Sequence, residues 1–168
     1  MSCSECFKGH SHNGQPTGEA REMFGRPTYV ASPPDDKPVK GVFVIVPDAF
    51  GWVWYLAQTI YGMAPFFYYN GLAVSSPRIR SFFEALRLHE GPEQRIRAAG
   101  FCWGCKPVLT LAHPESITED GILLVDAVFP GHPSGMSLPG DAEAIIKPVS
   151  VAIGDRDIVT SMSQVNVM

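Results

Sequence analysis

The chain has 168 residues, of which 45% are hydrophobic and 18% charged, and its formal net charge is −4. This length and composition predict a single folded domain and exclude a disordered chain. No cluster of Lys and Arg occurs, so we expect no nucleic-acid partner. The first residues lack the apolar run of a secretory signal, which favours a cytoplasmic protein with reduced thiols.

Residues 1–25 are polar and rich in Gly, and we expect an irregular lead-in there. They include side chains of the types that bind zinc, namely Cys3, Cys6, His10 and His12. The spacing of these residues is tighter than in most structural zinc sites. A plain lead-in is therefore the preferred interpretation, and no metal is expected.

Residues 27–31 form a short candidate strand, and the β-branched run 40–46 is typical of a central strand buried on both faces. From residue 49 to 77 the chain has no charged side chain and many aromatic ones. That length would permit a membrane span, but Gly and Pro interrupt it and its Trp and Tyr are scattered throughout. A helical segment packed on the protein is favoured over a membrane anchor.

A helix is predicted to begin at Ser76, with Pro77 in its first position. Apolar residues then recur at helical spacing and form one stripe, made of Ile79, Phe82, Phe83 and Leu86. The charged residues off that stripe are expected to face solvent; they are Arg78, Arg80, Glu84 and Arg87.

Further strands are expected at residues 94–101, 122–129 and 148–154, and a helix is expected from 104 to about 113. Strands that alternate with helical segments indicate βαβ units. The predicted fold class is therefore α/β, with a mostly parallel sheet flanked by helices.

The sequence from Gly100 to Gly104 places Cys102 in the pattern glycine-x-nucleophile-x-glycine. A strand is predicted before it and a helix after it, which is the setting of a nucleophile on a sharp strand-to-helix turn. Glycines two residues before and after the nucleophile let neighbouring chain pass close by. The alternative is a buried structural cysteine in a glycine-rich turn, because free cysteine is often buried.

Such a nucleophile needs an oxyanion hole and a carboxylate partner. The backbone N–H of Trp103 is one candidate donor, and the N–H of Ala49, in the loop after the 40–46 strand, is the other. The acid should follow a later strand, where Asp155 and Asp157 are both available. The residues alone do not choose between these two.

Three stretches together resemble the dienelactone hydrolase family, its fungal members in particular: residues 48–51, 99–106 and 154–159. The resemblance implies an α/β-hydrolase fold and hydrolysis of a small ester or lactone through an acyl-enzyme, without a cofactor. It implies that Cys102 is the nucleophile and that Asp157 rather than Asp155 is the triad acid. It also implies that Asp48 lies beside the nucleophile, in the pocket.

The chain departs from the family pattern in two places, so we expect one domain, 1–168, with an incomplete α/β-hydrolase fold. About one βα unit is lacking after residue 52, and members continue past the acid to a histidine that does not follow Asp157 here. His132 is a candidate pocket residue. It precedes the acid in the chain, so it does not match the family's histidine by order, and geometric substitution for that histidine is the less favoured alternative. The alternative to an active hydrolase is an inactive truncated fragment or an interaction module.

Overall fold

The structure is a computed structural model, and it describes residues 14, 16–48, 70–157 and 159–166. Its strands are β1 (Glu19–Met23), β2 (Arg26–Val30), β3 (Val42–Val46), β4 (Ile96–Phe101) and β5 (Ala127–Gly131). Its helices are α2 (Leu72–Glu90), the 3₁₀ turn η2 (Cys102–Gly104), α3 (Cys105–Thr110), α4 (Gly140–Glu143) and α5 (Met162–Val165).

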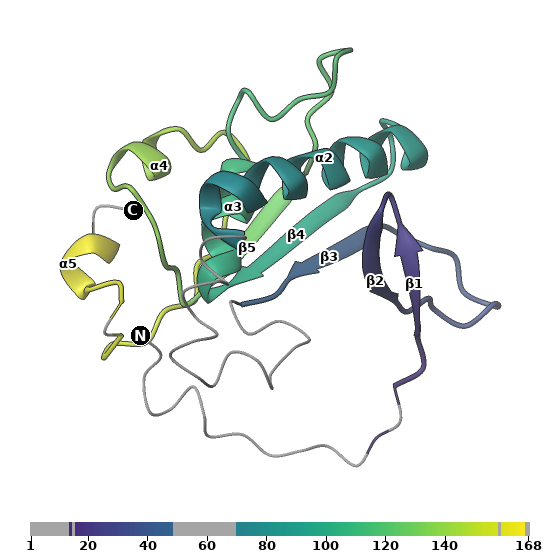
Figure 1. Cartoon of the computed structure of the whole chain (residues 1–168), viewed down its shortest axis with the longest axis horizontal. Coiled ribbons are helices and arrows are strands. Elements are labelled where there is room, and N and C mark those ends of the chain that lie inside the picture. The colour runs from purple at the N-terminus through teal and green to yellow at the C-terminus, as the bar shows by residue number, and fades with distance from the viewer. Residues whose placement is uncertain (1–13, 15, 49–69, 158, 167–168) are drawn as a thin grey trace.

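Strands β3, β4 and β5 form a parallel sheet in that order (Figure 1). The predicted α/β class is confirmed, and the sheet with its helices is compatible with part of an α/β-hydrolase fold. The strand expected at 122–129 is found later, at 127–131. The strand expected at 148–154 is reduced to two parallel bridges, Val149 to Val128 and Ala152 to Gly131.

A separate hairpin of β1 and β2 lies beside the parallel sheet, at the right of Figure 1. The expectation of an irregular lead-in over residues 1–25 is therefore wrong for Glu19–Met23. Phe24 and Gly25, the two residues between the strands, have φ angles of 51° and 71°. Positive φ at both positions is the geometry of a tight hairpin turn, and Phe is an unusual residue for it. Composition did not reveal this turn.

Helices α2 and α3 cover one face of the sheet (Figure 1), and the core lies between them and the strands. The predicted apolar stripe of α2 is confirmed, since Phe83 and Leu86 are buried and Ile79 and Phe82 pack against the core. On β3, Phe43 and Ile45 are each 59% exposed. The expectation that this strand is buried on both faces is wrong, because side chains alternate between faces and one face stays open.

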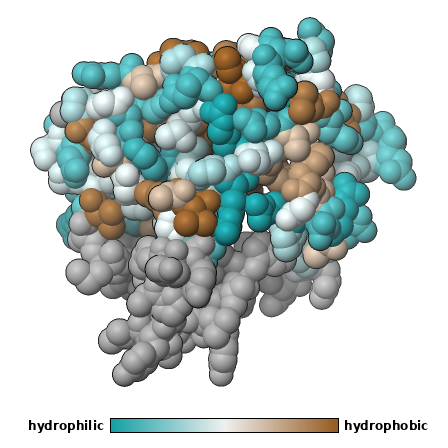
Figure 2. Space-filling model, turned by 45° about the horizontal axis from the view of Figure 1, so that its top comes forward, coloured by the Kyte–Doolittle hydropathy of each residue, from teal (hydrophilic) through white to brown (hydrophobic). Residues whose placement is uncertain are grey.

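The surface in Figure 2 has hydrophobic residues scattered among hydrophilic ones, as is usual for a protein in water. Within the part of the chain that the structure describes, no helix is long and apolar enough to cross a membrane.

Helix α2 begins earlier than predicted. The amides of Val74 and Ser75 both donate to the Gly71 carbonyl, so the helix is already under way before Pro77. Ser76 is therefore not the N-cap. Pro77 therefore lies inside the helix, where it lacks the amide that would donate to the Ala73 carbonyl.

Arg87 of α2 is buried, with 2% of its side chain exposed, so the expectation that it faces solvent is wrong. Its guanidinium donates to the carbonyls of Gln94 and Leu124, at 2.6 and 3.3 Å, and to the Asp126 carboxylate at 3.1 Å. Asp126 also accepts the Ile96 amide at 2.8 Å. The side chain thus ties α2 to the start of β4 and to the chain entering β5. Helical periodicity could not show a contact with residues this far along the chain.

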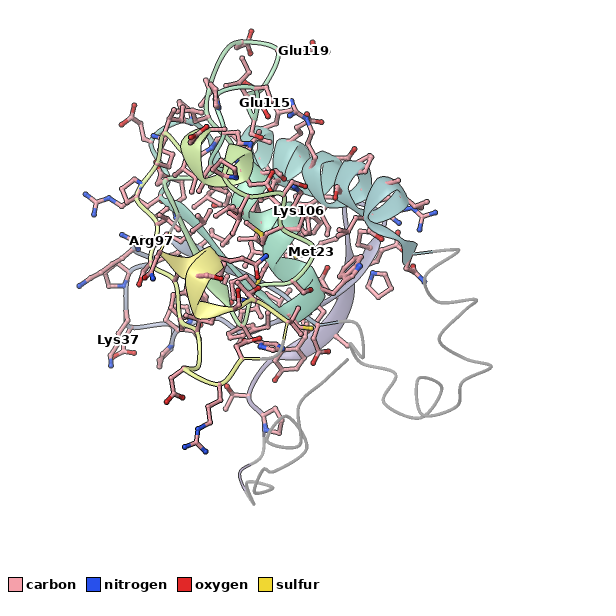
Figure 3. All side chains as sticks on the ribbon, turned by 90° about the vertical axis from the view of Figure 1, so that its left-hand side faces the viewer. Met23, Lys37, Arg97, Lys106, Glu115 and Glu119 are labelled. Carbon is pink, nitrogen blue, oxygen red and sulfur yellow. The ribbon has the colours of Figure 1, made fainter. Side chains whose placement is uncertain are left out.

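A second ion pair joins Lys106 of α3 to Asp141 of α4. Figure 3 shows Lys106 within the body of the molecule, whereas Lys37 and Arg97 point outward. His113 reinforces the same contact through a hydrogen bond between its Nε2 and the Asp141 carbonyl. These bonds fasten α4 over α3.

We predict that Arg87→Ala lowers the free energy of unfolding by about 3 kcal/mol, the low end of the range for breaking a buried ion pair. The low end applies because Asp126 is still 42% exposed to water. Arg78→Ala, on the exposed side of the same helix, is the control and should stay close to wild type. Urea unfolding measures both, and equal stability of the two variants would contradict the role given to Arg87.

Candidate active site

The carboxyl ends of the parallel strands meet at one edge of the sheet. Asp48 follows β3, Cys102 follows β4 and His132 follows β5. Asp157 follows the bridged segment 149–152, which lies beside β5. Ligands of open α/β sheets bind at this edge. The structure therefore brings four of the predicted residues to one edge, in the order Asp48, Cys102, His132, Asp157.

Cys102 lies on the sharp turn between β4 and η2, and its φ of 51° is in the left-handed region that L-residues rarely adopt. The flanking glycines make that turn possible. A Cβ on Gly100 would lie 2.3 Å from the Gly104 carbonyl oxygen, and one on Gly104 would lie 2.6 Å from the oxygens of Val46 and Pro47. No side chain fits at either position. Cys102 is partly exposed, as a nucleophile at such a turn should be.

Cys105, three residues later, is fully buried. Its thiol donates to the carbonyls of Gly100 and Gly131 at 3.0 and 3.1 Å, and so bridges the ends of β4 and β5. Burial raises the pKa of this thiol to about 12. Cys105 is therefore an inert structural group that holds the turn in place.

His132 is the first residue beyond β5, and its φ of 54° is also left-handed. Its neighbour Gly131 pairs with Phe101, so His132 and Cys102 are the next residues after the last register pair of two adjacent strands. The backbones of neighbouring strands lie about 4.8 Å apart. The amide of His132 donates to the Ala152 carbonyl at 2.8 Å, which anchors this turn to the segment leading to Asp157.

Asp157 is hydrogen bonded to His132 through its Oδ2 and the imidazole Nδ1. Only 2% of its side chain is exposed. Its Oδ1 accepts the backbone amides of Val159 and Thr160, at 2.8 and 3.1 Å. Burial acts to raise the pKa of Asp157, but these two amides and His132 outweigh it and hold the pKa below its ordinary value. The group is therefore an ionised acceptor at neutral pH.

An ionised carboxylate only accepts hydrogen bonds, so the Nδ1 of His132 must carry the proton. In the neutral imidazole, Nε2 is then left with a lone pair. This atom is buried and has no hydrogen-bond partner among the described residues. The Cys102 thiol is therefore not bonded to it in this structure. A nucleophile–base bond of this kind commonly forms only when substrate is bound.

The remaining predicted site residues differ in how the structure places them. Trp103 directly follows Cys102 in η2, where an oxyanion N–H is needed, and that role stays a prediction. Ala49 lies outside the described residues. Asp155, the rival to Asp157, is exposed in the turn before it. Sequence reasoning did not find Thr160, which is buried and whose hydroxyl donates to the Pro133 carbonyl at 2.6 Å. This bond closes the Asp157 loop onto the His132 turn.

Two surface hollows lie elsewhere in the described part of the chain. One is lined by Pro33 and residues 37–41, and the other mainly by α2 and residues 117–120. Neither is lined by a cysteine, serine or histidine, so we assign no chemistry to them. Among the described residues, no three His, Cys, Asp or Glu side chains are grouped to hold a metal ion.

No family model matches the chain, and no solved structure matches it. Three curated proteins do. Hydrolase pyvD of Aspergillus violaceofuscus is 26% identical over 183 aligned positions, which span 90% of this chain and 69% of the relative. Dienlactone hydrolase 1 of Gibberella moniliformis is 28% identical across 77% of this chain and 60% of the relative. Dienlactone hydrolase 2 of the same fungus is 46% identical over 46 residues, 27% of this chain and 20% of the relative.

The chain is similar to dienelactone hydrolases. All three relatives carry names of hydrolases, which supports a hydrolase-like enzyme by resemblance. The chain spans between a fifth and about two thirds of the length of these relatives. The predicted gap after residue 52 and the expected single domain 1–168 stay predictions.

We predict that a thiol-alkylating reagent labels Cys102 in the folded protein and leaves Cys105 intact. A thiol with a pKa of about 12 has a thiolate fraction of only ~10⁻⁴ at pH 8, and burial also blocks access to it. Peptide mapping by mass spectrometry separates the two positions, and denatured protein serves as the control in which both react. Equal labelling of both thiols in folded protein would contradict the burial of Cys105.

We predict that Asp157 makes the fold sensitive to acid. A carboxyl whose pKa is lower in the folded state stabilises the fold above its unfolded pKa, here 3.8, and loses that contribution as pH falls through the folded value. The stability difference between wild type and Asp157→Asn should therefore be largest near neutrality and shrink below about pH 4. Thermal unfolding across this pH range measures it, and a difference that grows with acid would refute it. Asp155→Asn, in the exposed part of the same turn, is the control.

Proposed function

We propose that the chain hydrolyses a small ester or lactone, with Cys102 as the nucleophile and a thioester acyl-enzyme as the intermediate. The observation that carries this proposal is the backbone of Cys102. A non-glycine residue with φ of 51° between a buried parallel strand and a helical turn, with glycines packed on both sides, is the arrangement of a nucleophile elbow. The names of the relatives support the same reaction class.

In the proposed reaction, the thiolate of Cys102 attacks the carbonyl carbon, and the carbonyl electron pair moves onto oxygen. The backbone amides of Trp103 and Ala49 would donate to that oxyanion. Collapse of the tetrahedral species breaks the carbon–oxygen bond, releases the alcohol and leaves the acyl group on sulfur. Water then cleaves the thioester and restores the thiol. None of these steps requires a cofactor.

The surroundings of Cys102 support this role over that of a structural cysteine. Cys105 is the structural cysteine, because its thiol is buried and hydrogen bonded to two carbonyls. Cys102 is partly exposed and lies at the edge where ligands of α/β sheets bind. Asp48, two residues beyond β3, is proposed to line the same pocket. Because the reaction needs a reduced thiol, we also propose that the protein works in the cytoplasm.

The test uses a p-nitrophenyl ester of a short acid, whose phenolate leaves without protonation. We expect wild-type protein to release p-nitrophenol and to carry one acyl group on Cys102, seen by intact mass and peptide mapping. Cys102→Ala should show neither. His89→Gln, at an exposed position of α2, is the matched control and should behave like wild type. Unchanged p-nitrophenol release by Cys102→Ala would contradict the proposal. Absence of release and of acylation in wild type would favour the alternative of an inactive fragment or interaction module.

A further inference from the structure

The Nε2 atom of His132 is a feature of the sheet edge that its structural contacts do not explain. It is buried, and no described residue hydrogen bonds to it. An unpaired buried acceptor is unfavourable, because it gives up a hydrogen bond to water without gaining one in the protein. Its ring is nevertheless held firmly, because Nδ1 is bonded to Asp157 and the backbone amide is bonded to Ala152. A ring fixed on one side, with a lone pair on the other, is the form of a general base.

The position of this lone pair relates it to Cys102. Phe101 and Gly131 are the last register pair of β4 and β5, and Cys102 and His132 follow them directly. Both residues then turn out of the sheet with nearly the same left-handed φ. Asp157 lies beyond His132 on the side away from β4, next to the bridged segment 149–152. Along the edge, the order is therefore nucleophile, imidazole, carboxylate.

We propose that His132 is the general base of the reaction and that Asp157 is its positioning residue. This inference rests on the proposed function, because it presupposes Cys102 as the nucleophile. In chain order the imidazole precedes the acid, whereas hydrolases of this class place histidine last. Triads are defined by geometry and roles, and unrelated folds reach the same geometry with different chain orders.

The proton balance assigns a task to Nε2 in each half of the reaction. It takes the proton of the Cys102 thiol as sulfur attacks, and gives it to the departing alkoxide as the carbon–oxygen bond breaks. It next takes a proton from water, whose hydroxide attacks the thioester carbon. When the carbon–sulfur bond breaks, the electron pair returns to sulfur and the imidazolium proton restores the thiol. Asp157 keeps the Nδ1 proton throughout and stabilises the imidazolium that forms.

The second half of the reaction provides the sharper test, because an activated aryl ester can acylate a thiolate without a base. His132→Asn suits it for two structural reasons. The asparagine amide nitrogen occupies the place of Nδ1, so the bond to Asp157 is kept while Nε2 is removed. Asparagine also tolerates the left-handed backbone at this position.

We expect His132→Asn to accumulate the acyl group on Cys102 with a normal burst and to deacylate ~10²–10⁴-fold more slowly than wild type. Asp157→Asn should also keep the burst and lose deacylation, which a merely destabilising change would not produce. Asp155→Asn, from the same turn, should deacylate like wild type. Resistance of Cys105 to alkylation reports that each variant is folded; if His132→Asn fails this check, His132→Gln, which also lacks a basic nitrogen, replaces it.

Two results would overturn the inference. Deacylation of His132→Asn at the wild-type rate, with Cys102 acylated in both proteins, would remove His132 as the base and leave the proposed nucleophile standing. Slow deacylation of both proteins would likewise remove His132 as the base, because wild type would then gain nothing from the imidazole. If wild type acylates no residue, or acylates a residue other than Cys102, the proposed function itself fails. The two failures are thus distinguished by the identity and lifetime of the acyl-enzyme.

Discussion

Three parallel strands in a continuous register are the constraint on which the rest of this structure depends. Because β3, β4 and β5 run the same way, the residues that leave their carboxyl ends must emerge side by side. The close packing of Gly104 against the end of β3 and the two hydrogen bonds of the Cys105 thiol lock that edge. The buried Arg87 fixes the opposite end, where β4 begins and the chain enters β5. The position of Cys102 follows from these contacts.

The sequence predicted the turn at Cys102 more fully than the fold around it. Glycine spacing was sufficient to place Cys102 on a sharp strand-to-helix turn, because only glycine fits where the chain packs against β3. The apolar stripe of α2 could also be predicted from the sequence, since it depends on helical periodicity alone. The choice of Asp157 over Asp155 came from family resemblance, and the structure brings only Asp157 to His132.

What the sequence did not reveal depends on contacts between distant residues. His132 and Asp157 are 25 residues apart, and each lies in a loop with no periodic pattern. Arg87 lies off the apolar stripe of its helix, yet it is buried by a partner 39 residues away. The β1–β2 hairpin depends on Phe24 adopting a backbone conformation that its side chain disfavours. In each example tertiary contacts override a local preference.

The hydrogen bond to Asp157 sets the tautomer of His132, and the tautomer decides whether Nε2 can accept a proton. Nitrogen-15 NMR of the imidazole measures the tautomer directly. We expect that Nδ1 carries the proton in the neutral imidazole, that Nε2 does not, and that Asp157→Asn shifts the Nδ1 proton signal. A His132 ring protonated at Nε2 alone, or one whose signals are unchanged by Asp157→Asn, would contradict it.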